Sequence, residues 1–339
     1  KGIFGAATNF FDQPDLVKPL LENKNAQKTV TQKDQETAKR LINAYRSDIF
    51  ASDSPTWYRG NIGCSAAIEK DRLRLHLEHL GARRLVVGHT PTPSRTIESR
   101  FNGMLVRVDT GILNSHYHGQ PSATIIQGDK VTAYYPNSSD DNSISTQARR
   151  VGPRPGRINL TDMALEQVLS TAPILSNELQ EDNSTLVTID YEGRPIQARF
   201  TADQSKKRSS TSLPEVAAYR LDQHLGMEMI PVAVPRNVDG KSGVIRLDTD
   251  KLIDEDQRMT RRLGSSAWCS LKDQFNMMYA FDILLHNKGR QRNAMRYTSS
   301  DMRLILTDNE NTLGVERGAP RYLKSAVVAV PAYLKSQLQ

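Results

Sequence analysis

Long apolar runs are missing from this sequence of 339 residues, and cysteine is scarce. No stretch of about 18 apolar residues occurs, so the sequence predicts no transmembrane helix and no membrane partner. The 2 cysteines, Cys64 and Cys269, are too few for a zinc site of their own, and we expect them to be free buried thiols. There is no aromatic-and-basic stripe and no zinc-finger spacing, so the net charge of +7 does not favour a nucleic-acid partner.

A turn-rich middle segment predicts two domains, in keeping with a prior of roughly 150 residues for each. Residues 136–158 are polar, include Gly152-Pro-Arg-Pro-Gly156, and show neither helical nor strand periodicity. We therefore expect a first domain over 1–135, a linker over 136–158 and a second domain over 159–339. No signal-peptide pattern follows Lys1, and the compartment stays open between the cytoplasm and export after loss of a leader.

The periodicity of apolar residues and the turn signals predict a mixture of helices and strands. The apolar run from Arg84 to Gly88 predicts a short strand that is buried on both faces. Other expected strands lie at 104–109, 123–127, 131–135, 184–190, 196–200 and 302–308. Expected helices lie at 32–45, 69–80, 214–224 and 272–285. The fold class is α+β / α/β.

The clearest chemical motif in the first domain is Gly88-His89-Thr90-Pro91. Gly88 ends the apolar run, so His89 is expected at the carboxyl end of a strand, where open sheets collect functional residues. Neutral imidazole is a good ligand for manganese, iron or zinc. Trp57-Tyr58-Arg59-Gly60 lies upstream, and Asp109-Thr110-Gly111 follows on the next expected strand.

Over about Asp53 to Tyr135, this order resembles the distal half of bacterial calcineurin-like metallophosphoesterases of the phosphoprotein phosphatase type. The resemblance implies half of a β-sandwich, with His89 as a metal ligand and Arg59 as a clamp for the substrate phosphate. A guanidinium suits that bidentate role. The implied cofactor is a pair of divalent metals (Mn, Fe or Zn), and the implied substrate is a phosphoprotein or another phosphate ester.

The earlier motifs of that family, G-D-x-H-G, G-D-x-x-D-R-G and G-N-H-E, have no counterpart in this chain. A two-metal site needs those further ligands. We therefore expect the isolated chain to be inactive, and its partner to be the missing N-terminal half of the phosphatase domain, in the same gene product or in a separate chain. Lys1-Gly2-Ile3 fits the tail of the family's H-x-G-[IL] motif, so a histidine is expected before Lys1. We interpret His116 and His118 as solvated residues of a loop.

The second domain carries a different succession of polar residues. Glu215 lies at the start of an expected helix, Phe281 to Arg290 is followed by Asn293, and Thr307-Asp308-Asn309 ends an expected strand. Over about Ser184 to Lys324 this order resembles the atypical kinases related to the secretory-pathway (Golgi) kinases. The resemblance implies that Glu215 pairs with a nucleotide-binding lysine, and that Asn293 and Asp308 bind metal, with ATP and Mg or Mn as cofactors.

Two positions depart from the kinase pattern. Gly289 occupies the place of the catalytic aspartate, and Thr201 occupies the place of the nucleotide-binding lysine. Loss of both groups slows phosphoryl transfer by orders of magnitude, which favours a pseudokinase with a regulatory role beside the phosphatase. Two alternatives stay open: an active kinase in which Asp282 or Asp308 substitutes as the base, and a non-catalytic nucleotide- or partner-binding scaffold. In the plainest interpretation, Asp308-Asn309 only turns the chain and Glu215 pairs with an arginine.

Overall fold

The computed structural model describes residues 32–45, 54, 57–136, 145–146, 160–203, 213–249, 251–265, 268–309, 312–313 and 318–339. The chain divides into two compact units. The first unit comprises Lys1–Arg59 with Ser266–Trp268, and the second comprises Gly60–Ser265 with Cys269–Gln339. The predicted linker and the residues around Lys1 lie mostly outside the described residues, so the predicted domain boundaries stay a prediction.

The first unit contains helix α3 (Gln32–Tyr45), which confirms the helix predicted over these residues. The second unit begins with two helices, α4 (Gly60–Gly63) and α5 (Ala66–His79). Leu73 and Leu77 of α5 are buried, and Gly81 follows the helix with a φ of 61° that favours glycine. The predicted helix over 69–80 is confirmed, with its start three residues earlier.

A four-stranded sheet follows, with the order β1-β3-β2-β6. Its strands are β1 (Leu85–Val87), β2 (Glu98–Arg100), β3 (Leu105–Arg107) and β6 (Ser145–Thr146). β1 pairs in parallel with β3 and is an edge strand of this sheet. The prediction that this strand is buried on both faces is wrong, because Val86 is 42% exposed. An edge position leaves an apolar strand face without the covering that a central parallel strand has.

Between β3 and β6 lie the short helix α6 (Asn114–Tyr117) and a hairpin. The hairpin strands are β4 (Ala123–Gln127) and β5 (Lys130–Tyr134), which confirms the hairpin predicted around Gly128-Asp129. Ile125 and Ile126 are neighbours that point to opposite faces of the hairpin, and both are nearly half exposed. The two-stranded hairpin is therefore partly solvated on both of its faces.

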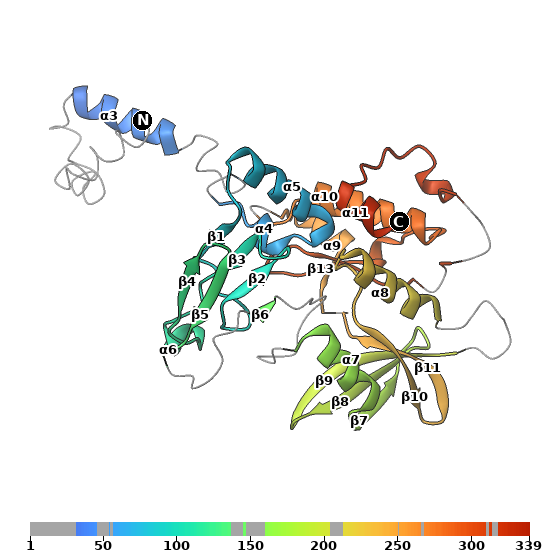
Figure 1. Cartoon of the computed structure of the whole chain (residues 1–339). Helices are drawn as coiled ribbons and strands as arrows, with labels where there is room; N and C mark the ends of the chain where they lie inside the picture. The colour runs from blue at the N-terminus through green and yellow to red at the C-terminus, as the bar shows by residue number, and fades with distance from the viewer. Residues whose placement is uncertain are drawn as a thin grey trace, which may run out of the picture. The chain divides into compact units, whose positions relative to one another are not determined.

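A second, five-stranded antiparallel sheet has the order β10-β11-β9-β8-β7 (Figure 1). Its strands are β7 (Ile174–Leu179), β8 (Thr185–Tyr191), β9 (Arg194–Ala202), β10 (Ala233–Val238) and β11 (Lys241–Leu247). The helices α7 (Asp162–Thr171) and α8 (Leu213–Leu225) contact this sheet. They also contact each other, because Tyr219 Oη donates to Glu166 Oε1 at 2.7 Å. The two helices therefore pack against each other as well as against the sheet.

The rest of the chain adds a third sheet and several helices. These elements are β12 (Ile253–Asp254), α9 (Glu255–Thr260), α10 (Leu271–Leu284), η2 (Arg292–Ala294), β13 (Met295–Tyr297), β14 (Leu304–Leu306), η3 (Arg321–Leu323) and α11 (Ala332–Gln337). The predicted helices over 214–224 and 272–285 are confirmed as α8 and α10. The mixed α+β class is confirmed as well.

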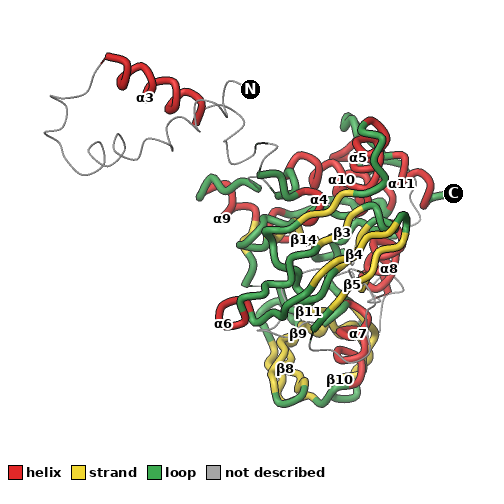
Figure 2. The backbone as a smooth tube through the Cα atoms, turned by 60° about the vertical axis from the view of Figure 1, so that its left-hand side comes forward, coloured by secondary structure: helices red, strands yellow, loops and turns green. Residues whose placement is uncertain are grey.

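The main hydrophobic core joins parts of the chain that are far apart in sequence. Cys64, Ala67 and Ile68 pack in the same buried cluster as the inner residues of the five-stranded sheet and of α10. Helix α5 contacts both α10 and α11, and Figures 1 and 2 show these three helices side by side. A second, small cluster lies between the first sheet and the hairpin.

Buried arginines reinforce this junction. Arg100 of β2 donates to the backbone oxygens of Asn61 and Cys64 at 2.8 and 2.7 Å. It also lies 3.7 Å from Glu228, and Arg303 lies 3.6 Å from the same carboxylate. Burial lowers the pKa of the Arg100 guanidinium to about 10, which leaves it charged near neutral pH. The Glu228 carboxylate therefore pairs with two arginines, one from the N-terminal part and one from the C-terminal part of the second unit's sequence.

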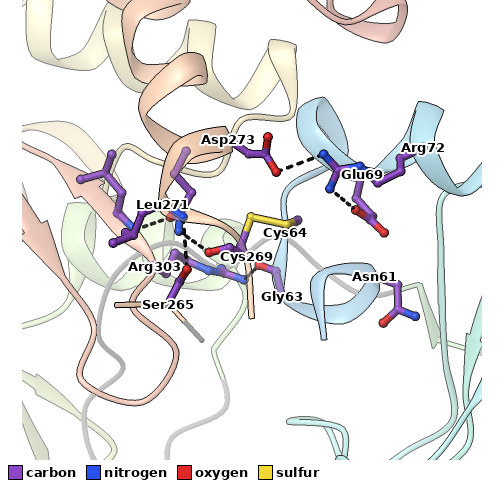
Figure 3. The surroundings of a disulfide bond; sticks show 12 residues. Asn61, Gly63, Cys64, Glu69, Arg72, Ser265, Cys269, Leu271, Asp273 and Arg303 are labelled. Carbon is purple, nitrogen blue, oxygen red and sulfur yellow. Dashed lines mark hydrogen bonds and ion pairs between the residues drawn. A yellow bond between two sulfur atoms is a disulfide. The ribbon is translucent and has the colours of Figure 1, made fainter. Parts of the chain in front are cut away.

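Cys64 and Cys269 form a disulfide across 205 residues of sequence (Figure 3). The prediction of free buried thiols is wrong, since folding brings the two Cα atoms to 4.8 Å of each other, well within the usual range for a bridge. The bond lies between the start of α5 and the start of α10. An ion pair beside it joins the same two helices, between Arg72 and Asp273 at 3.0 Å. Among the described residues, no helix has the length and apolar character that a membrane crossing needs.

Because the disulfide closes a long loop, Cys64→Ser is expected to lower the free energy of unfolding by about 2–5 kcal/mol. Cys269→Ser and the double variant should show the same loss, because each change removes the same bond. Urea unfolding of the unreduced proteins measures the three values. Alkylation of the unreduced wild type followed by mass spectrometry checks the bond itself, and two alkylated cysteines would contradict it.

Candidate functional site

His89 follows the carboxyl end of β1, as the sequence predicts. Its φ of 69° lies in the left-handed region, and its side chain is exposed. Thr92 N donates to Asp109 O at 2.8 Å, so the loop after β1 is bonded to the loop after β3. The structure therefore brings the Gly88-Pro91 segment and the Asp109-Gly111 segment to the same edge of the sheet.

Arg59 belongs to the first unit and His89 to the second, so the joint phosphatase site that the resemblance implies for them stays a prediction. Arg59 makes local contacts. Its Nη1 donates to Trp57 O at 2.9 Å, and its guanidinium lies 5.6 Å from the centre of the Trp57 ring.

His116 and His118 lie in and directly after α6, and both are exposed, in line with the predicted solvated loop. Within the part of the chain that the structure describes, no three His, Cys, Asp or Glu side chains come close enough to hold a metal ion. The metal role of His89 and the phosphate role of Arg59 stay predictions.

In the C-terminal half, a continuous buried network surrounds the end of β14. Its first member is Asp282, a fully buried residue near the end of α10. The carboxylate forms an ion pair with Arg290 at 2.5 Å and accepts hydrogen bonds from Asn287 Nδ2 at 3.1 Å and Tyr322 Oη at 2.6 Å. Burial raises the pKa of the Tyr322 hydroxyl, and the neighbouring Asp282 charge raises it further. The hydroxyl therefore stays protonated and donates.

The proposed substitution of Asp282 for the catalytic base is wrong for a physical reason. A general base must reach the proton that it abstracts. Asp282 is 0% exposed, and its oxygens already accept from three side chains. It is a structural carboxylate that holds the loop after α10.

Arg290 carries the network onward from Asp282. Its Nη1 donates to Thr307 O at 2.7 Å, and its Nη2 donates to Asn309 Oδ1 at 3.1 Å. Asn309 in turn donates from its backbone N to Glu215 Oε2 at 2.8 Å. The resemblance to kinases implies a lysine as the partner of Glu215, and the structure places Glu215 against Asn309. The network thus links α10, the following loop, the end of β14 and α8.

The side chain of Asp308 is not a member of this buried network. Its φ is 58°, which directs the chain into a turn, and its side chain is 46% exposed. Arg246 of β11 lies beside it, with its Nη2 3.9 Å from Asp308 Oδ1. Sequence reasoning missed Arg246, although a single charged residue between the apolar Ile245 and Leu247 is a signal that could have found it.

The remaining residues of the kinase-like pattern lie in η2, in the loop after α10 and on β9. Asn293 is exposed in η2, and the next residue, Ala294, accepts a hydrogen bond from Thr307 N at 3.0 Å. Gly289 is exposed, and its backbone N donates to Asn287 Oδ1 at 3.2 Å. Thr201 is exposed near the end of β9. The segments that carry Glu215, Asn293 and Asp308 therefore meet, while the functional roles of these residues stay predictions.

Comparisons with known proteins add little to this geometry. No protein-family model matches the chain, and no curated protein matches it. A solved structure, the Helicobacter pylori proinflammatory kinase CtkA, is similar at 17% identity with a TM-score of 0.30. The match covers 43% of this chain and 60% of that chain, which is less than two thirds of its length. A likeness this weak carries no argument about function, so the function is argued from the site alone.

The role of Asp282 is tested by Asp282→Asn, which leaves the Arg290 guanidinium buried without its counter-charge. We expect a loss of about 3–5 kcal/mol in the free energy of unfolding, as for other broken buried pairs. Urea unfolding followed by circular dichroism measures it.

The matched control is Asp256→Asn, which breaks an ion pair with Arg292 between side chains that are 66% and 61% exposed. Exposed pairs contribute about 0–1 kcal/mol, so this variant should unfold almost as the wild type does. Equal losses for the two variants would show that the buried network does not stabilise the fold.

Proposed function

We propose that the C-terminal half of the chain is a kinase-like module that binds a metal–nucleotide complex without transferring phosphate efficiently. The observation that carries the proposal is the exposed Asp308 carboxylate beside Arg246, on a turn that Asn309 and Glu215 hold in place. A carboxylate beside a guanidinium, on a turn whose backbone is held in place, suits a complex of a divalent metal and a polyphosphate.

The order of elements supports the same proposal. Three antiparallel strands come first, then a helix that begins with buried Glu215, then two more strands. A longer helix, a loop and the β13–β14 hairpin follow, and the hairpin ends in Thr307-Asp308-Asn309. Kinases place their glutamate helix, catalytic loop and metal-binding aspartate in this succession.

The residues near the turn suit a hard divalent metal. Asp308 offers carboxylate oxygens, and Asn293 offers an amide oxygen from the segment bonded to Thr307. Mg²⁺ and Mn²⁺ prefer such oxygen ligands and keep several waters beside substrate phosphates. The metal would neutralise charge on the phosphates, while this chain's residues would bind and orient it.

The loop after α10 lacks the group that phosphoryl transfer needs. Gly289 has no side chain at the expected position of the base, and Asp282 is sealed in the buried network. A positioned general base contributes about 10²–10⁴-fold to a rate. Binding without efficient turnover is therefore the function that this loop supports.

Calorimetric titration with ATP and Mg²⁺ or Mn²⁺ tests the proposal. The wild type should bind, and Asp308→Ala should bind about 10- to 100-fold more weakly, because a charge-assisted contact is lost. Asp129→Ala, in the exposed β4–β5 turn, is the matched control and should bind as the wild type does. A wild type that binds no nucleotide with either metal would refute the proposal.

Phosphoryl transfer is measured separately with labelled ATP. We expect no autophosphorylation by the wild type, since no carboxylate stands at Gly289. Robust transfer that is lost in Asp308→Ala would show instead that the chain is an active kinase with an unorthodox base.

The phosphoesterase activity of a complete protein stays a prediction. It requires the missing half of the phosphatase domain, a pair of divalent metals, His89 and Arg59. Manganese-dependent hydrolysis of p-nitrophenyl phosphate by the full-length gene product would test it, with His89→Ala expected to abolish the activity.

A further inference from the structure

Two arginines lie side by side on the five-stranded sheet. Arg246 of β11 is the direct antiparallel partner of Arg199 of β9. Residues directly opposite each other in such a pair project from the same face of the sheet. Two guanidinium groups therefore stand next to each other on adjacent strands.

The face that carries them is the one turned away from the end of α7. Arg236 of β10 pairs with Gly243 of β11, so these two residues project from one face, and Arg246, three residues further along β11, projects from the other. On β10, Arg236 has the opposite orientation, because its guanidinium donates to the backbone oxygens of Leu169 and Ala172 at the end of α7. Arg246 therefore extends toward the Asp308 turn rather than into the helix layer.

Arg199 is the more enclosed of the two arginines. Its Nη1 donates to Ser184 Oγ at 2.5 Å and to Asp182 Oδ2 at 3.2 Å, and its Nε lies 3.7 Å from Asp248 Oδ1. Although burial works to raise it, hydrogen bonds from Ser184 and the charges of the two arginines hold the pKa of the Asp182 carboxyl below its usual value. The carboxylates of Asp182 and Asp248 offset the positive charge of Arg199, so a second cation, Arg246, can lie beside it.

The guanidinium of Arg246 is held more loosely than that of Arg199. Its Nη1 donates to Thr249 Oγ1 at 3.2 Å. The 3.9 Å between its Nη2 and Asp308 Oδ1 exceeds a hydrogen-bond distance, so the two charges attract each other without being locked together. A carboxylate and a guanidinium at this spacing match the two halves of a metal–polyphosphate complex.

We propose that Arg246 is the phosphate-contacting cation of the nucleotide site, in the role that the resemblance to kinases implies for a lysine at the position that Thr201 occupies. This inference rests on the proposed nucleotide binding. On binding, Asp308 would contact the metal and Arg246 would contact phosphate oxygens. Each of the two side chains would then have an opposite charge of the ligand in place of the other side chain. The planar guanidinium suits phosphate oxygens through two parallel hydrogen bonds. Arg199 is a positioning residue beside it.

The test compares Arg246→Ala with wild type in titrations with ATP·Mg and with adenosine. ATP should bind about 10- to 100-fold more weakly to the variant, because a charged hydrogen-bond partner of the phosphates is gone. Adenosine has no phosphate, so its affinity should not change. Arg246→Gln keeps much of the side-chain stem and should show the same selective loss, and Arg246→Lys should recover part of the affinity for ATP.

Arg194→Ala is the matched control, since it removes the same charge from an exposed position at the start of β9. It should bind both ligands as the wild type does. If the wild type binds ATP and Arg246→Ala binds it equally well, the assignment of Arg246 fails while nucleotide binding stands. Equal weakening of ATP and adenosine would assign Arg246 a structural role only. No binding of ATP by the wild type would refute the proposed function itself.

Discussion

The buried ion pair between Asp282 and Arg290 connects the elements on which the candidate site depends. Both side chains are almost completely enclosed, at 0% and 2% exposure. Burying two charges is favourable only when their remaining hydrogen-bonding groups also find partners. Here Tyr322 and Asn287 complete the carboxylate, while Thr307 O and Asn309 complete the guanidinium. The pair therefore fixes three separate chain segments at once.

The N-terminal part of the second unit also packs against the helices that carry this network. Helix α5 packs against α10, and the disulfide from Cys64 to Cys269 joins the starts of these two helices. Helix α11 contacts both α5 and α8, and Tyr333 N donates to Asp71 Oδ2 at 2.6 Å. Since α8 carries Glu215, helix α11 connects α5 by packing to the helix whose Glu215 accepts a hydrogen bond from Asn309.

Local signals in the sequence predicted the local structure well. Leucine spacing and the glycines at 81 and 226 located α5 and α8, because helix faces and helix ends depend on neighbouring residues. The pairing of Cys64 with Cys269 and the position of Arg246 beside Asp308 depend on contacts across 205 residues and between separate sheets. The residue pattern within a single segment carries no information about such long-range contacts. The exposure of β1 was missed for a related reason, since an apolar run does not tell whether its strand is central or at an edge.

The loop after α10 shows how structural and chemical roles separate within one motif. The buried Asp282 carboxylate needs Arg290, because without the guanidinium it would be an unpaired buried charge. Position 289 has no such structural role. Gly289 is exposed, and its backbone N donates a hydrogen bond to Asn287 Oδ1. A base can therefore be absent from this position while the loop keeps its shape and the Asp308 turn keeps its support. In the proposed function, the Asp308 turn would then still be available to a metal and phosphates, while position 289 offers no group to act as the base.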